Sequence, residues 1–136
     1  MQTILIVEDD PQLQNALSDT FIREGFNTLR ANDGIEGLQK ALENSPNLVI
    51  LDLLMPNMDG MTMLNELRKD ASGRNMPVII LTNMQPDKEE IDKVMMNYPS
   101  YFLIKTVALS EVVEKVREVL EKGTSEQNKV ALANAA

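Results

Sequence analysis

The sequence contains no cysteine and no histidine among its 136 residues. Zinc sites, thiol nucleophiles, histidine bases and phosphohistidine are therefore excluded, because each of them needs one of these two side chains. Any chemistry must instead use carboxylates, hydroxyls and lysines.

Basic residues are also scarce: 13 lysines and arginines stand against 21 aspartates and glutamates, a formal net charge of -8. Nucleic-acid binding depends on clustered lysine and arginine, and no basic stripe is present, so we expect no nucleic-acid partner. No apolar run reaches the length of a membrane span, and no basic leader precedes the first apolar run. We expect a cytoplasmic protein of one domain, without membrane association.

Strand-like apolar runs alternate with amphipathic helical patterns along the chain. The strands are predicted at residues 3–7, 27–31, 47–51, 77–81 and 101–104. This alternation in one domain predicts a doubly wound α/β fold, with five parallel strands and helices on both faces of the sheet.

Capping residues set the expected helix boundaries. Asp10 before Pro11 is typical of an N-cap, and we favour this role over a metal-binding one. Gly25 is expected to end the first helix, whose core-facing residues are Leu13, Ala16, Leu17, Thr20 and Phe21.

The later helices are expected to begin similarly. Asp33 should cap the second helix, with Ile35, Leu38, Ala41 and Leu42 on its apolar face. Pro86 or Asp87 should open the fourth helix, and Ser110 should cap the last. The apolar periodicity stops at Gly123, so we expect a domain at residues 1–122 and a frayed tail at residues 123–136.

Acidic residues follow two of the predicted strands. Glu8 and Asp9 come directly after the first strand, and Asp52 follows the third. The carboxyl ends of parallel strands lie along one edge of a sheet, so these carboxylates should converge. At such distances two like charges repel by about 1 to 4 kcal/mol, which favours a bound cation. Oxygen ligands without histidine or cysteine suit Mg²⁺, or Mn²⁺; the alternative is that the acids only cap helices.

Three residues at this edge could support phosphoryl chemistry. Asp52 is a candidate nucleophile, since an aspartate can form an acyl phosphate. Lys105, after the fifth strand, could hold the transferred group, and Thr82, at the end of the fourth, could donate a hydrogen bond. Taken singly, Lys105 could equally be a solvated lysine and Thr82 a helix cap.

Four motifs together resemble one known family, the receiver (CheY-like) domain of two-component response regulators. They are ILIVEDD at residues 4–10, DLLMPNMDG at residues 52–60, Thr82 and Lys105, and the resemblance extends over about residues 2 to 122. It implies a flavodoxin-like (βα)5 fold with strand order 2-1-3-4-5. It also implies a signalling switch that is no enzyme, beyond catalysing its own phosphorylation and dephosphorylation.

The resemblance assigns a role to each site residue. Asp52 would accept a phosphoryl group from the phosphohistidine of a histidine kinase or phosphotransfer protein, or from a small phosphodonor. Thr82 would move toward this group, Lys105 would hold it, and Phe102 would occupy the aromatic switch position. The ligands implied for Mg²⁺ are Glu8, Asp9, Asp52 and the backbone carbonyl of Leu54.

The output implied is a changed surface on the fifth strand and the last two helices. It would bind a downstream protein target, or form a phosphorylation-dependent dimer. No DNA-binding or enzymatic segment follows Lys122, so we expect a stand-alone switch.

The chain departs from the family pattern in places. Thr106 stands where the family usually has proline after the lysine, and Phe102 lacks the hydroxyl of the usual tyrosine. Leu54 and Met84 flank the path of hydrolytic water in this family, and neither can orient water. We therefore expect a comparatively long-lived phosphoryl group, against the alternative that both residues only cover the site.

Other functions fit less well. An aspartyl phosphohydrolase dependent on Mg²⁺ would need an acid in place of Leu54, and a flavin module would place its phosphate against Glu8, Asp9 and Asp10. An unphosphorylated scaffold or docking module remains the main alternative.

Overall fold

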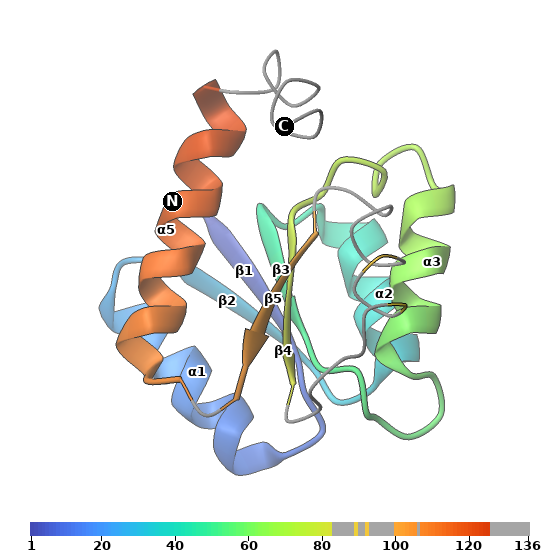
Figure 1. The fold of residues 1–136 in the computed structure, drawn as a ribbon, viewed down its shortest axis with the longest axis horizontal. Helices are drawn as coiled ribbons and strands as arrows, with labels where there is room; N and C mark the ends of the chain where they lie inside the picture. The colour runs from blue at the N-terminus through green and yellow to red at the C-terminus, as the bar shows by residue number, and fades with distance from the viewer. Residues whose placement is uncertain (83–88, 90–91, 93–99, 106, 126–136) are drawn as a thin grey trace.

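The computed structural model describes residues 1–82, 89, 92, 100–105 and 107–125. Its sheet has five parallel strands in the order β2-β1-β3-β4-β5, which confirms the predicted fold (Figure 1). The strands are β1 (Thr3–Val7), β2 (Asn27–Ala31), β3 (Leu48–Leu51), β4 (Val78–Thr82) and β5 (Ser100–Ile104).

The helices are α1 (Pro11–Arg23), α2 (Gly34–Asn44), α3 (Gly60–Lys69) and α5 (Leu109–Ser125). The predicted caps Asp10 and Asp33 are confirmed: their side chains accept from the backbone N–H groups of Gln12 and Glu36. The helix expected from Pro86 or Asp87 falls in a stretch of which only residues 89 and 92 are described.

Two predictions about α5 differ from the structure. Ser110 is not the cap, because the helix begins at Leu109 and Ser110 lies in its first turn, where Ala108 O accepts from Glu111 N–H. The helix also continues to Ser125, three residues beyond the expected boundary at Lys122. Residues 126–136 lie outside the described part of the chain.

Gly25 ends α1 as predicted, with a φ of 94° that favours glycine. Phe26 N–H donates to Phe21 O and Gly25 N–H to Ile22 O, which satisfies carbonyls of the last turn. The rings of Phe21 and Phe26 then meet edge to face at 5.7 Å, and this contact fixes the path from α1 into β2.

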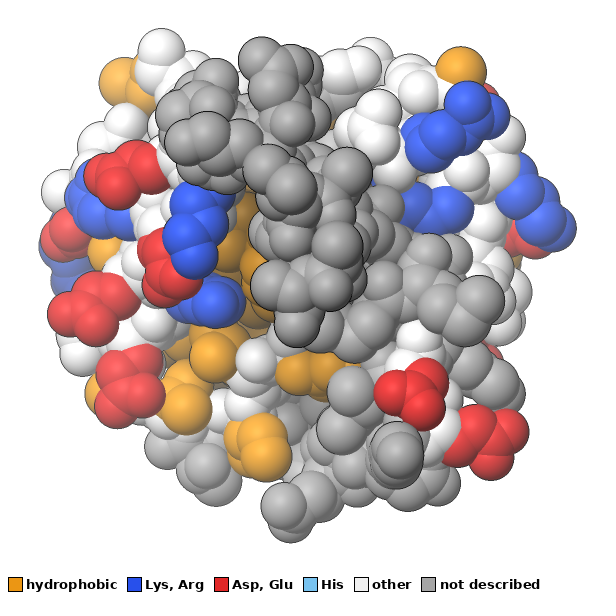
Figure 2. Space-filling view, turned by 45° about the horizontal axis from the view of Figure 1, so that its top comes forward, with side chains coloured by type: hydrophobic (Ala, Val, Ile, Leu, Met, Phe, Trp, Pro, Cys, Tyr) orange, Lys and Arg blue, Asp and Glu red, His pale blue; other side chains and the backbone are white. Residues whose placement is uncertain are grey.

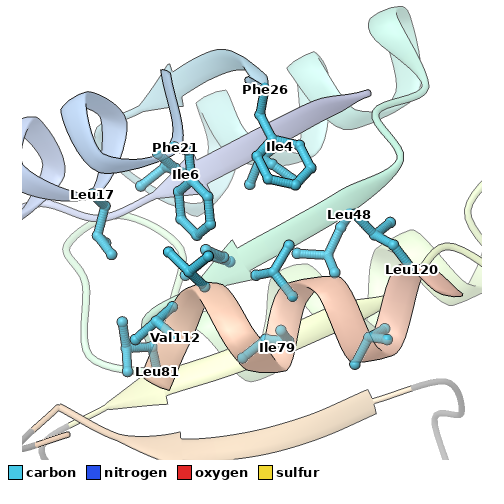
Figure 3. Close-up of a cluster of buried hydrophobic side chains, with 14 residues drawn as sticks. Ile4, Ile6, Leu17, Phe21, Phe26, Leu48, Ile79, Leu81, Val112 and Leu120 are labelled. Atoms are coloured by element: carbon cyan, nitrogen blue, oxygen red, sulfur yellow. The ribbon is translucent and has the colours of Figure 1, made fainter. Parts of the chain in front are cut away.

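Alternate residues of each central strand serve opposite faces of the sheet. Ile4 and Ile6 pack with α1 and α5, whereas Leu5 and Val7 pack with α2 and α3, and the helix pairs lie on opposite sides in Figure 1. Figure 3 shows the first of these cores, where side chains of α5 point toward those of β1 and α1. Among the larger contributors to this core are Leu17, Phe21, Leu48, Ile79, Val112 and Leu120.

Ile35 does not join the core, contrary to the periodicity of α2, and is 54% exposed. It lies in the first turn of the helix, whereas Ala41, further along, is fully buried. Periodicity fixes the direction of a side chain around the helix axis, but not how far the helix overlaps the sheet. No helix within the described residues combines the length and the apolar character needed to cross a membrane.

Candidate functional site

Strand pairing brings the acidic residues to one edge of the sheet. Val7 pairs with Leu51 at the ends of β1 and β3, so Glu8 and Asp52 leave the sheet side by side. The Asp52 N–H still donates to Val7 O at 3.1 Å. On the other side of β3, Thr82 of β4 pairs with Ile104 of β5, directly before Lys105. The predicted convergence on this edge is thus confirmed for the backbone.

The side chains of Glu8, Asp9 and Asp52 form one cluster. Each offers a carboxylate oxygen, and these oxygens all lie within 4.8 Å of one another. Glu8 and Asp52 are only 3% and 5% exposed, whereas Asp9 is exposed. The cluster therefore has two buried carboxylates and one that faces solvent. A cation and a phosphoryl donor can approach it from the side of the exposed carboxylate.

Lys105 connects the two buried carboxylates. Its Nζ lies 2.7 Å from Glu8 Oε1 and 3.0 Å from Asp52 Oδ2. The lysine side chain is itself only 13% exposed. It is therefore no solvated surface lysine, and its single charge is shared between two carboxylates.

Burial changes the proton affinities in this pocket. It raises the pKa of Glu8 from 4.5 to about 7, against the opposing hydrogen bond from Lys105 and with a further upward push from the charge of Asp52. Burial alone would lower the pKa of Lys105, but its hydrogen bonds to Glu8 and Asp52 raise it instead. Lys105 therefore keeps its positive charge at neutral pH, whereas the carboxyl of Glu8 is partly protonated there.

The loop after Asp52 holds that residue closely. Leu54 N–H donates to Asp52 Oδ1 at 3.3 Å, and Gly60 N–H closes the loop onto Leu53 O at 3.0 Å. A Cβ at Gly60 would lie 2.3 Å from Asp52 O, so only glycine allows this approach. The Asp52 side chain is thus held by Leu54 N–H, and the backbone of Gly60 packs closely against the Asp52 carbonyl.

The same loop is tied to the start of α2. Asn57, with a φ of 68°, donates from Nδ2 to Asp33 Oδ2 at 2.7 Å. Gly34 N–H donates to Met58 O at 3.2 Å. The hydrogen bond from the backbone N–H of Glu36, and then that from the Asn57 side chain, hold the pKa of Asp33 below its usual range.

Sequence reasoning missed two residues that support the site. Asn57 has a signal in the sequence, since asparagine after proline tolerates a left-handed conformation. Gln14, which is 7% exposed and donates to Glu8 O, has only a weak signal, as a polar residue beside the apolar face of α1.

Only some of the remaining predicted site residues lie within the described part of the chain. Leu54 is 58% exposed beside Asp52, and Phe102 is partly buried against the core on the α2 and α3 side. The side chain of Thr82, and Met84 and Thr106 entirely, lie outside the described residues. Asp10 acts as a helix cap, and its N–H donates to Glu8 Oε2 at 3.2 Å.

Comparisons with known proteins agree with this geometry. The profile of the family described as "Response regulator receiver domain" matches residues 4–117. The chain is 32% identical over 122 residues to the DNA-binding dual master transcriptional regulator RpaA of Synechocystis sp., covering 90% of this chain and 50% of that protein. It therefore spans about half the length of such curated relatives.

Solved structures lead to the same family. A CheY-like response regulator receiver domain protein from Methanospirillum hungatei has a TM-score of 0.85 at 26% identity, over 93% of this chain and 98% of that one. The response regulator protein TrrA of Thermotoga maritima, solved in complex with Mg(2+)-BeF, has a TM-score of 0.76 at 28% identity, over 87% and 98%. The chain belongs to the receiver domain family of two-component response regulators.

Proposed function

We propose that the chain is a phosphoacceptor switch and that Asp52 receives the phosphoryl group. The observation that carries this proposal is the ion pair of Lys105 with both Glu8 and Asp52, at 2.7 and 3.0 Å, beside the exposed Asp9. An oxygen of Asp52 would attack the phosphorus of a phosphohistidine on a histidine kinase or phosphotransfer protein. The new P–O bond makes an acyl phosphate, while the P–N bond breaks and the imidazole nitrogen keeps its electron pair and takes up a proton.

The donor set of the pocket fits Mg²⁺, and Mn²⁺ as a second choice. Its oxygens come from Glu8, Asp9 and Asp52, with the Leu54 carbonyl as the fourth proposed ligand. When bound, the metal ion would neutralise charge on the phosphoryl oxygens. The likeness to TrrA, solved with Mg(2+)-BeF, supports this assignment.

The chain's own residues would orient and hold the transferred group. Lys105 is placed to exchange its hydrogen bond with Asp52 Oδ2 for one with a phosphoryl oxygen, since its Nζ is already 3.0 Å from that carboxylate. Thr82 would add a hydroxyl donor from the adjacent strand. The chemistry is limited to transfer onto Asp52 and later loss to water, so the chain acts on itself and not as an enzyme on other substrates.

The output would be a changed surface of β5, α5 and the helix expected before β5. Thr82 and Phe102 would be its switch residues. Phe102 lies on β5, three residues before Lys105, which follows the end of this strand, and β5 would thereby connect the pocket to this surface. The expected partner is a downstream protein target, or a second copy of the chain, in the cytoplasm.

A protein target fits the charge distribution better than nucleic acid. Lys and Arg occur beside Asp and Glu on both sides of the face in Figure 2, within the described part of the chain. The formal net charge is -8. The DNA-binding activity named for RpaA belongs to a protein about twice the length matched here, and we do not extend it to residues 1–136.

The test is phosphorylation by acetyl phosphate in Mg²⁺, followed by intact mass. The wild type should gain one phosphoryl group, and its beryllofluoride complex should form only with Mg²⁺. Asp52→Asn should lose both, whereas Asp19→Asn, at an exposed position on α1, should retain both. A wild type that gains no mass and binds no mimic would favour the scaffold alternative.

We further infer that the phosphoryl group on Asp52 is long-lived. Leu54, at 58% exposure beside the acceptor, offers no polar atom in its side chain to orient an attacking water, and Met84 offers none at the second family position. Leu54→Asn with Met84→Glu should shorten the half-life of the phosphorylated protein by about tenfold. An unchanged half-life would mean that both residues only cover the site.

A further inference from the structure

Gln14 is a polar residue on the sheet-facing side of α1, and it is 7% exposed. Its Nε2 lies 2.9 Å from Glu8 O, 3.1 Å from Ala31 O and 3.0 Å from Asn32 Oδ1. All three partners are acceptors, so one amide group supplies hydrogen bonds to the ends of both β1 and β2.

These contacts fix the backbone at the point where Glu8 leaves the sheet. Glu8 N–H donates to Ala31 O at 3.1 Å, and Glu8 O accepts from Gln14. Both peptide groups that flank the Glu8 Cα are therefore held. The direction of the Glu8 side chain, and the start of Asp9, follow from these two peptide planes.

We propose that Gln14 is a positioning residue for the acidic pocket: it holds the strand end so that Glu8 and Asp9 present their carboxylates to the same cation. Mg²⁺ needs near-octahedral oxygen ligands at about 2.0 to 2.1 Å, so small displacements of a ligand weaken binding. Groups that orient metal ligands typically change affinity by about 10 to 100-fold when removed. This inference rests on the proposed function, because it concerns the same metal site.

The test variant is Gln14→Met, which keeps the length of the side chain and removes both N–H donors. It leaves Glu8 O and Asn32 Oδ1 without the hydrogen bond from Gln14. Gln14→Asn is a milder second variant, whose donor is one methylene shorter.

The matched control is Ser18→Ala, one turn further along α1. Ser18 is fully buried and its Oγ is 2.8 Å from Thr28 Oγ1 of β2, so it supports the same contact between α1 and β2. Its hydrogen bond goes to the second residue of β2 and not to the strand end beside Glu8. A merely structural role of Gln14 would therefore be reproduced by this variant.

Two measurements separate the roles: Mg²⁺ affinity by calorimetric titration, and amide hydrogen exchange at Glu8 in metal-free buffer. Gln14→Met should raise the dissociation constant about tenfold and accelerate exchange at Glu8 beyond the global loss of stability measured in urea. Gln14→Asn should act in the same direction with a smaller effect. Ser18→Ala should leave the dissociation constant within about twofold of the wild type, with exchange changed only in line with global stability.

If Gln14→Met matches Ser18→Ala in both measurements while the wild type binds Mg²⁺, the inference is wrong and the proposed function stands. If the wild type shows no Mg²⁺ binding, the proposed function fails and the inference about its metal site fails with it.

Discussion

The buried Glu8 carboxyl should make the protein less stable as the pH rises. Its pKa is about 7 in the folded protein and 4.5 as the ordinary value, because burial disfavours the charged form. Between these values the folded state keeps a proton that the unfolded state has released, so the free energy of unfolding falls with increasing pH. At 1.36 kcal/mol per pKa unit the whole effect is about 3 kcal/mol.

The perturbation is Glu8→Gln, which removes the titrating group at nearly constant shape. It also places an N–H group near the Asp10 N–H, which now donates to Glu8 Oε2, and this adds a cost that does not depend on pH. That cost cancels when the difference in unfolding free energy between variant and wild type at one pH is subtracted from the same difference at another pH. From pH 5 to pH 8 this difference should move in favour of the variant by about 2 to 3 kcal/mol.

The assay is urea denaturation followed by far-ultraviolet circular dichroism, in EDTA, at pH 5 and pH 8. Glu43→Gln, at an exposed position on α2, measures the effect of removing one surface charge and is subtracted. Excess Mg²⁺ should stabilise the wild type more at pH 8 than at pH 5, since a metal ion competes with the proton for Glu8. A difference that stays constant over this pH range would refute the reasoning: it would mean that Lys105 keeps Glu8 ionised throughout.

Three further substitutions test other parts of the structure by the same urea assay. Lys105→Met should lower the free energy of unfolding by about 3 kcal/mol at pH 8 in EDTA, because it leaves two buried carboxylates without their shared cation; an unchanged value would contradict the ion pair. Gly60→Ala should cost about 1 to 3 kcal/mol and slow phosphorylation by acetyl phosphate, since the added Cβ would lie 2.3 Å from Asp52 O; full activity and stability would refute the close approach. Arg68→Met should cost about 2 to 3 kcal/mol, because the Arg68 guanidinium donates to the partly buried carbonyls of Gly73 and Met76 and to Ser100 Oγ. Phosphorylation by acetyl phosphate should continue in that variant, and a loss of phosphorylation without a loss of stability would contradict a structural role of Arg68.

The fold could be predicted because its signals are local and repeated. The run Ile4 to Val7 is apolar at every position, which is typical of a strand covered on both faces, and the structure uses alternate residues for the two cores. Asp10 and Asp33 stand directly before their helices and cap them. Ser110 has the same chemistry but lies inside the first turn, because Ala108 supplies the first carbonyl acceptor.

For the pocket, the sequence predicts which residues come together but not the contacts that support them. Parallel strands bring Glu8, Asp52 and Lys105 to one edge, and the sequence order of the strands is enough for that inference. The supporting contacts could not be predicted, because they depend on the relative placement of separate elements. Asn57 reaches Asp33 across 24 residues, and Gln14 reaches Asn32 across 18, and no short motif contains either pair.

The charge balance of the pocket explains why its charged residues need the residues that hold the backbone in place. Three carboxylates and one lysine leave an excess of two negative charges when all four groups are ionised. One oxygen of each carboxylate lies within 4.8 Å of an oxygen of the other two, so these charges are close together. Without contacts that hold the backbone, the carboxylates could turn toward solvent and relieve this repulsion. The hydrogen bonds that Glu8 O accepts from Gln14, that Asp52 N–H donates to Val7 O and that Gly60 N–H donates to Leu53 O keep the strand ends in place instead. Above the pKa of Glu8, where this carboxyl is ionised, we therefore expect the pocket to retain its unfavourable charge until a cation or a phosphoryl group changes it, and that retained energy is what a switch of this type can use.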